Sequence, residues 1–241
     1  MENNTKTNYT IFALILGLSL VASAIIGSAT FYKLRSMDYI SSTGSAKKAV
    51  ISDKVKWSSN ISRSVRESTI EEGYSKMETD LKEVKAFLIK NGIKEESIEV
   101  SPVYMNEVWE QNPSSEKKYN LSQNIEIQSE EVEKIGEMAK NVSELVQKGI
   151  LFSINSLEYY YSKLPEARVE LLAEAVGDAK ARAEQLAKAG GKKIGALKSA
   201  SSGVVQVMSE NSLEISDYGM YDTSKINKEI MVTVKASFEI N

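Results

Sequence analysis

The sequence predicts an α+β fold: an N-terminal transmembrane helix, then antiparallel sheets with three helices in the order βαββαβαββ. Three observations predict it. Residues 9–32 form an apolar run long enough to cross a membrane. Several later stretches alternate apolar and polar residues with period two, as half-buried strands do. Three segments between those stretches carry apolar residues at steps of three and four, which is typical of amphipathic helices. The first six elements match the βαββαβ order of ferredoxin-like folds.

The composition argues against several classes of protein. The chain has 241 residues, a net charge of −3, no cysteine and no histidine. Disulfides, thiol nucleophiles, thiolate metal sites and histidine bases are therefore absent, which makes a conventional hydrolase or oxidoreductase improbable. A nucleic-acid binder would need a basic face, so nucleic acid is not an expected partner. We predict no catalytic, cofactor-binding or metal-binding residues.

The first 35 residues are interpreted as a membrane anchor or an uncleaved signal sequence. No charged residue lies between Thr7 and Tyr32, and this run can cross a bilayer core of roughly 30 Å. The stretches Ala22–Ala24 and Gly27–Ala29 resemble signal-peptidase sites, so a cleaved signal peptide is the alternative. The apolar run is longer than a typical signal core, which favours the anchor.

The charges that flank this run leave its orientation open. Lys6 precedes the run, whereas Lys33 and Arg35 follow it, so a positive-inside count places the following domain in the cytoplasm. Large domains translocate largely regardless of such counts. Residues 36–46 are small and polar and are interpreted as a linker to a domain at residues 47–241.

Residues 49–65 form the first predicted strand of the domain. Apolar residues dominate the odd positions, and serine, lysine and asparagine occupy most even ones. This length would span about 56 Å in extended form, roughly three times the usual strand. We therefore expect a bend, a bulge or a strand that serves two sheets, with Asp53 and Arg63 as candidate break points.

Residues 70–88 form the next predicted helix, with one apolar stripe that we expect to pack on a sheet. Ser68 and Thr69 each precede a glutamate by three residues, a capping-box pattern, and Asn91-Gly92 supplies a left-handed stop. The stripe consists of Ile70, Tyr74, Met77, Leu81, Val84 and Leu88.

A hairpin and a second helix follow. Residues 98–109 and 119–128 are predicted strands joined by a loop that contains Asn112-Pro113. The second strand has polar residues at alternate positions, so we expect one face of the hairpin to be solvated. Residues 129–148 carry a helical apolar stripe that ends at Gly149.

Two features of the later chain could contact a ligand. A strand at residues 153–161 ends in three tyrosines, Tyr159 to Tyr161, and side chains alternate faces along a strand. At least one ring should therefore meet a surface other than the main core; packing or a subunit contact is the simpler interpretation, and ligand stacking is the alternative. Residues 208–225 are polar and unpatterned, which indicates a mobile or interface segment. They separate predicted strands at residues 196–207, with a weak middle at 199–203, and 230–240.

The third predicted helix carries the most informative motif. It begins near Pro165 and ends at Gly190-Gly191, and small residues on successive turns present a narrow strip for close packing. The motif is Ala175-x-x-Asp178-Ala179-x-x-Arg182-Ala183-x-x-Leu186-Ala187, followed by Ile194-Gly195.

This motif resembles the signature of the SIMPL domain family of bacterial envelope proteins, a domain of unknown function. Gly44-Ser45-Ala46 and Gly92-Ile93 also fit, and the resemblance covers residues 43–240. The family's early Pro-Asp pair is missing here, where Ser52-Asp53 stands instead. Asp178 and Arg182, four residues apart, are expected to form a helix-face ion pair worth a few tenths of a kcal/mol rather than a catalytic site.

The resemblance implies a secreted or membrane-tethered domain on the extracytoplasmic side, in the periplasm or at the cell surface. It implies self-association into a homo-oligomer and links to envelope integrity and oxidative stress, without an established reaction. It supplies no catalytic residues and no cofactor.

Three functions compete at this stage. The first is a non-enzymatic protein that is anchored in the membrane through residues 9–32 and forms a homo-oligomer. The second is a small-ligand binding module that uses Tyr159–Tyr161, or residues 208–225 as a lid, for an unknown ligand. An enzyme ranks third, because Ser75-Lys76 and Ser162-Lys163 are adjacent rather than spaced for serine–lysine catalysis.

Overall fold

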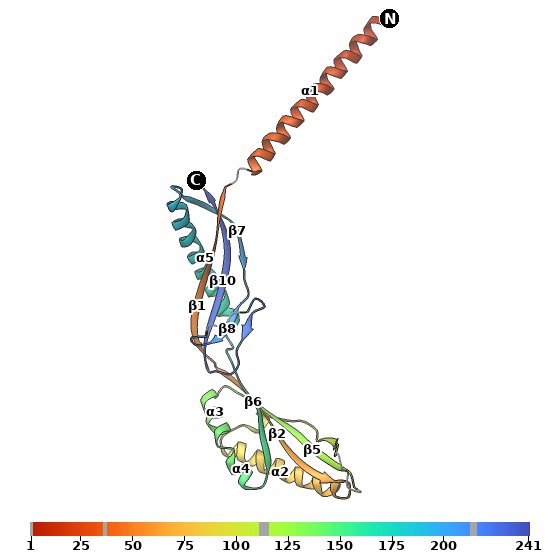
Figure 1. The fold of residues 1–241 in the computed structure, drawn as a ribbon, viewed down its shortest axis with the longest axis vertical. Coiled ribbons are helices and arrows are strands. Elements are labelled where there is room, and N and C mark those ends of the chain that lie inside the picture. Colours follow the sequence, from red (N-terminus) through yellow and green to blue (C-terminus); the bar gives the residue numbers. More distant parts are fainter. Residues whose placement is uncertain (1, 36–37, 111–115, 213–215) are drawn as a thin grey trace. The chain divides into compact units, whose positions relative to one another are not determined.

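The computed structural model describes residues 2–35, 38–110, 116–212 and 216–241, which form a mixed α and β structure (Figure 1). The chain divides into two compact units, which are described separately. Unit 1 contains Met1–Ser45, Glu174–Gly203 and Val234–Asn241, and unit 2 contains Ala46–Ala173 and Val204–Thr233. The α+β class and the apolar N-terminal helix agree with the sequence prediction.

Helix α1 covers Glu2–Arg35. Its stretch Phe12–Tyr32 has a mean hydropathy of 2.2, and none of that stretch is buried against protein. Its 21 residues rise by about 1.5 Å each, which matches the hydrocarbon thickness of a bilayer. By length and composition, α1 is therefore suited to be a membrane anchor or a signal sequence.

The long strand predicted at residues 49–65 is in fact the end of one strand and nearly all of a second. Strand β1 covers Tyr39–Ile51 and β2 covers Lys54–Arg66. β1 joins a sheet that we call sheet A, and β2 joins a second sheet, sheet B. The break falls beside Asp53, one of the two predicted points, whereas Arg63 lies inside β2.

The prediction of a linker at residues 36–46 is wrong for residues 39–46, and residues 36–37 lie outside the described residues. Residues 39–46 belong to β1, which pairs with β10 in sheet A. This part of β1 packs through its backbone and has small polar side chains. Its sequence therefore lacks the apolar alternation that predicts a strand, and it resembles a linker.

Sheet B lies in unit 2 and has the strand order β3-β5-β2-β6, with β4 beside β5. These strands are Ile98–Val100 (β3), Tyr104–Val108 (β4), Lys118–Ser129 (β5) and Leu151–Tyr160 (β6). The order is that of a ferredoxin-like split βαβ arrangement. The predicted single strand at 98–109 is two strands, because Pro102 between them has no N–H to donate to a ladder.

Helices α2 (Ile70–Lys90), α3 (Val132–Lys140) and α4 (Ser143–Gln147) pack against sheet B (Figure 1). The second predicted helix, at residues 129–148, is thus two helices, separated at residues 141–142. Asn91 and Gly92 end α2 as predicted, and Gly92 has a φ of +87°. The predicted capping box is wrong in detail: a short 3-10 turn, Glu67–Thr69, precedes α2, and the Thr69 hydroxyl accepts a hydrogen bond from the Arg66 N–H.

The core of unit 2 lies between sheet B and these helices. Its fully buried side chains come from alternate positions of β2 and β5 and from the apolar stripes of α2, α3 and α4: Trp57, Ile61, Met77, Leu121, Ile125, Ile127, Ile135 and Leu145.

Unit 1 contains the C-terminal part of helix α5 (Leu164–Ala189), strand β7 (Ile194–Ser202) and the ends of β1 and β10 (Asn227–Ile240). β10 pairs with β1 on one side and with β7 on the other.

The two strands β8 (Gln206–Ser209) and β9 (Met220–Tyr221) lie in unit 2. The predicted strand at 196–207 is therefore divided between β7 and β8. The segment 208–225, predicted to lack pattern, contains β9; residues 213–215 of it lie outside the described residues.

Candidate functional site

The alanine motif of α5 is a contact surface for β1. Its four alanines at positions 175, 179, 183 and 187 are at most 1% exposed. Gly44 of β1 lies directly against the helix backbone: a Cβ at Gly44 would stand 2.1 Å from the carbonyl oxygen of Ala175 and 2.3 Å from the nitrogen of Ala179. Strand and helix backbones therefore touch, which requires glycine on one side and small side chains on the other.

Hydrogen bonds fasten the same contact. The Ser42 hydroxyl donates to the carbonyl of Ala179 (2.5 Å), and the Ser45 N–H donates to a carboxylate oxygen of Asp178 (2.8 Å). The predicted pair of Asp178 and Arg182 is present, with a 2.9 Å contact. The hydrogen bond from Arg182, followed by that from Ser45, lowers the pKa of Asp178. The motif is thus structural: Asp178 joins α5 to an edge strand.

Asp53 organises a second cluster, in unit 2. Its carboxylate accepts hydrogen bonds from the N–H (2.7 Å) and the hydroxyl (2.6 Å) of Ser162, and its own N–H donates to the carbonyl of Tyr160. Burial opposes its charge, yet the bonds from Ser162 leave the pKa of Asp53 lowered. The Ser162 hydroxyl therefore donates its proton to Asp53 and not to the adjacent Lys163.

Lys228 lies in the same unit and is 1% exposed. Its Nζ donates to the carbonyls of Asp222 and Lys225 and lies 5.7 Å from the centre of the Tyr221 ring. Desolvation lowers the pKa of Lys228. Sequence reasoning missed this residue, although its even position matches the buried residues of the predicted strand at 230–240.

The three tyrosines at the end of β6 have different surroundings. Tyr159 is buried in the core, as alternation requires. The Tyr160 ring lies on the opposite face, 5.8 Å from the ring of Tyr221, and the N–H of Tyr161 donates to the Tyr221 hydroxyl (2.8 Å). The prediction that at least one ring meets a surface other than the core is confirmed.

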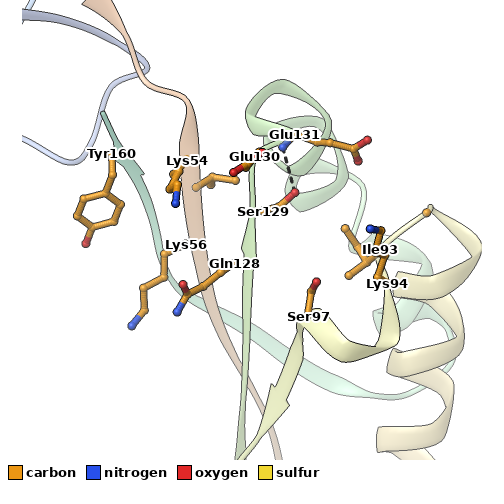
Figure 2. A pocket seen from close by; sticks show the side chains of 12 residues that line it. Lys54, Lys56, Ile93, Lys94, Ser97, Gln128, Ser129, Glu130, Glu131 and Tyr160 are labelled. Atoms are coloured by element: carbon orange, nitrogen blue, oxygen red, sulfur yellow. Dashed lines mark hydrogen bonds between the residues drawn. The ribbon is translucent and has the colours of Figure 1, made fainter. Parts of the chain in front are cut away.

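Tyr160 also borders a pocket of about 720 Å³ at one end of sheet B (Figure 2). The pocket is lined by both charge signs and several neutral donors. Lys56 is ion-paired with Glu126 (2.8 Å), whereas Lys54 and Lys94 have neither a hydrogen bond nor an ion pair within the described residues. The pocket thus offers two ammonium groups to a ligand.

A second pocket, of about 640 Å³, brings together two features that the sequence singled out. Tyr159 lines it, and so do Ser209, Glu210, Ser224 and Lys225 of the 208–225 segment. Tyr159 and this segment, which the ligand-binding hypothesis named as alternatives, therefore line one pocket.

The described residues offer little to a metal or to serine–lysine chemistry. They contain no group of three or more carboxylates able to hold a metal ion. In the adjacent pair Ser75-Lys76, the two side chains contact other residues. The Ser75 hydroxyl donates to the carbonyl of Glu71, and Lys76 is ion-paired with Glu72 (2.5 Å).

The chain matches a known protein family. The model of the SIMPL family, described as a protein of unknown function (DUF541), matches residues 40–238. The match includes the α5 motif and nearly all of β1 and β10. A comparison with curated proteins found no match.

Proposed function

The chain belongs to the SIMPL family of unknown function, and on that basis we propose that it is a non-enzymatic, membrane-anchored extracytoplasmic protein that forms a homo-oligomer. The proposal includes a role in envelope integrity or in the response to oxidative stress. Support comes from α1 for the anchor and from β7 for the assembly.

Helix α1 supports anchoring because its apolar side chains have no protein to cover them. Leu14, Leu18 and Ile25 are each more than 60% exposed. Leaving such a surface in water is costly, at roughly 25 cal/mol per Å² of apolar area, and a bilayer removes that cost.

The observation that carries the assembly is the exposed edge of sheet A. β7 pairs only with β10 among the described strands, and every residue from Ala196 to Ser202 is exposed. Leu197 is 48% exposed, and the one charged residue of the strand, Lys198, lies over the Tyr39 ring. Proteins usually guard such edges with several charges, bulges or a cover, whereas β7 has one lysine and an irregular register at Phe238. The rest of this edge is free of charge, which favours pairing with another chain.

Light scattering of the full chain in detergent and in nanodiscs tests the assembly. We expect an oligomer whose dissociation midpoint shifts at least tenfold in Leu197→Lys, because a lysine at the edge opposes strand pairing. Val169→Lys, at a residue of α5 that is 69% exposed, is the matched control and should leave assembly unchanged. A chain that stays monomeric in both media at the highest attainable concentration would refute the proposed assembly.

A small-ligand binding module is the second candidate, favoured by the two pockets and by the free ammonium groups of Lys54 and Lys94. A thermal-shift screen of envelope metabolites tests it with wild type and Lys54→Ala/Lys94→Ala. Stabilisation that the double variant loses would support this candidate, and no stabilisation by any compound would reject it.

The non-enzymatic part of the proposal rests on the missing histidine and cysteine and on the engaged hydroxyl of Ser162. A fluorophosphonate probe, which labels activated serines, should leave the chain unlabelled. Labelling of one serine, lost in a single Ser→Ala variant, would overturn this part.

A further inference from the structure

Sheet B has an open face that carries an unusual set of side chains. Helices α2, α3 and α4 pack on one face, where the odd residues of β2 and β5 are buried (Figure 1). The even residues point to the other face, and the register of β2 with β5 places six of them in three adjacent cross-strand pairs. We call these six the neutral field: Asn60 with Asn124, Ser62 with Ser122, and Ser64 with Asn120.

The polar groups of the neutral field are unused. None of the six side chains makes a hydrogen bond within the described part of the chain, and Oδ1 of Asn60 is shielded from water without a partner. Polar residues on the buried face behave differently: the Ser59 hydroxyl donates to the carbonyl of Ile125, and the Gln123 amide donates to the carbonyl of Ser101. The open face therefore presents donors and acceptors on a rigid support.

The choice of residues opposes the local structure. Asparagine is depleted in strands and serine is not among the residues enriched there, so three such residues at alternate positions of each strand weaken β2 and β5. The same face carries an ordinary solvated ion pair beyond the field, where Lys56 pairs with Glu126 (2.8 Å). Departures from local preference without a packing gain are expected at functional sites.

The chemistry of the field selects its partner. It carries no formal charge, and the cations that border it are ion-paired, Lys56 with Glu126 (2.8 Å) and Arg66 with Glu110 (3.3 Å). It therefore gives little electrostatic attraction to phosphates, nucleic acids or acidic peptides. Hydroxyls and amides both donate and accept, which complements the hydroxyl groups of a sugar. Strand β4 adds Tyr104, opposite Ser122 and 50% exposed, whose ring can cover an apolar sugar face.

The dimensions also suit an extended chain molecule. Three rows at two-residue spacing extend about 14 Å along the strands, and neighbouring strands lie about 4.8 Å apart. Polar residues extend two of these rows onto the flanking strands. Ser153 of β6 lies opposite Asn60, and Asn106 of β4 lies opposite Asn120. We propose that the neutral field binds a neutral glycan chain.

Calorimetry of the full chain in nanodiscs tests the proposal. The probes are cellopentaose, maltopentaose and chitopentaose, with an oligogalacturonate of equal length as the acidic comparator. We expect at least one neutral probe to bind, with an affinity that does not change with salt. Comparison of chitopentaose with cellopentaose distinguishes an N-acetylated glycan from a plain one.

Two variants connect the binding to the field. Ser62→Lys places a charge in its middle and should weaken binding at least tenfold, whereas Thr43→Lys, at an exposed position of sheet A, should not. Asn60→Val/Asn124→Val raises strand propensity, so the melting temperature should stay equal or rise while binding falls at least tenfold. A purely structural role predicts no loss of binding in this double variant.

Three results would overturn the proposal. They are no binding of any neutral probe, unchanged affinity in both field variants, and tighter, salt-dependent binding of the oligogalacturonate. None of them bears on oligomer formation, so this proposal and the proposed assembly can fail independently.

Discussion

Lys228 is a charged residue that the fold buries. Its buried ammonium group ties down the carbonyls of Asp222 and Lys225, so it holds the turn that leads from β9 to β10. Lys228→Met keeps the length of the side chain but leaves both carbonyls without that donor. We expect a loss of about 1–3 kcal/mol in the free energy of unfolding.

Hydrogen exchange measures this effect where it arises. Amides of residues 220–228 should exchange faster in Lys228→Met, whereas those of α2 should not change before global unfolding. Lys235→Met, at an exposed position of the same strand, is the control. Equal protection in wild type and Lys228→Met would show that the buried ammonium group is dispensable.

Tyr160 gives a second prediction at this scale. Its hydroxyl donates to a carboxylate oxygen of Glu158 (2.5 Å), and this bond, together with burial, raises the pKa of Tyr160 to about 12. Ionisation is therefore disfavoured in the fold, so the stability from this bond is present below pH 10 and lost as the pH rises toward 12.

Absorbance titration of the phenolate resolves this group. Tyr160→Phe should remove a component near pH 12, and Glu158→Gln should move that component down toward 10. Tyr218→Phe, which changes a ring that is 97% exposed, should leave it in place. An unaltered titration curve in Glu158→Gln would contradict the assigned cause.

At the scale of elements, the contact of β1 with α5 decides whether unit 1 holds together. Gly44→Ala would place a methyl group inside the Ala175 and Ala179 backbone, so helix and strand must separate. We expect a loss of at least about 1–3 kcal/mol, as for overpacked cores.

Gly177→Ala is the matched control, and its expected effect on stability has the opposite sign. Nothing lies within 4 Å of its added methyl group. Alanine in a helix interior should stabilise the chain by roughly 0.5–1 kcal/mol. Thermal unfolding followed by circular dichroism compares the two. A Gly44→Ala chain as stable as wild type would mean that the contact is looser than the backbone distances indicate.

Asp178 makes the same contact dependent on pH. Its pKa is lowered by Arg182 and by the Ser45 N–H, so the contribution of its charge is present above the unfolded value of 3.8 and lost as the pH falls below it. When the pH is lowered from 4, the melting temperature of Asp178→Asn should fall less than that of the wild type. Asp217→Asn, at an exposed turn, should reproduce the wild-type curve.

These elements also show how far sequence reasoning reaches. Alternation along residues 49–65 predicts β2, because each strand face meets a different environment. The excess length of that stretch predicts a break, for which Asp53 is one of two candidate points and the one that the structure shows. Residues 39–46 were missed, since a strand that packs through Gly44 and Ser42 has no apolar period. The alanine stripe predicted close packing correctly, but its partner strand became known only from the fold. The neutral field needed the register of β2 with β5, which no single strand contains.

At the scale of the whole molecule, α1 sets where everything else acts. An uncleaved anchor keeps the chain in the membrane, whereas a signal peptide would release a shorter soluble protein. The flanking charges predict a cytoplasmic domain, whereas the proposed function puts the domain on the other side of the membrane. A direct measurement of sidedness decides between these two predictions.

The absence of cysteine makes that measurement simple, because a single introduced thiol is the only one present. Tyr218→Cys places it at an exposed position of unit 2, and Asn3→Cys places it ahead of the apolar run. With a membrane-impermeant maleimide, we expect Tyr218→Cys to be labelled in intact cells and Asn3→Cys only after lysis, both in the membrane fraction at full length. The reverse pattern would place the domain in the cytoplasm and refute the extracytoplasmic proposal while leaving the fold untouched. A shorter soluble product lacking the Asn3→Cys thiol would show that the N-terminal segment is cleaved as a signal peptide.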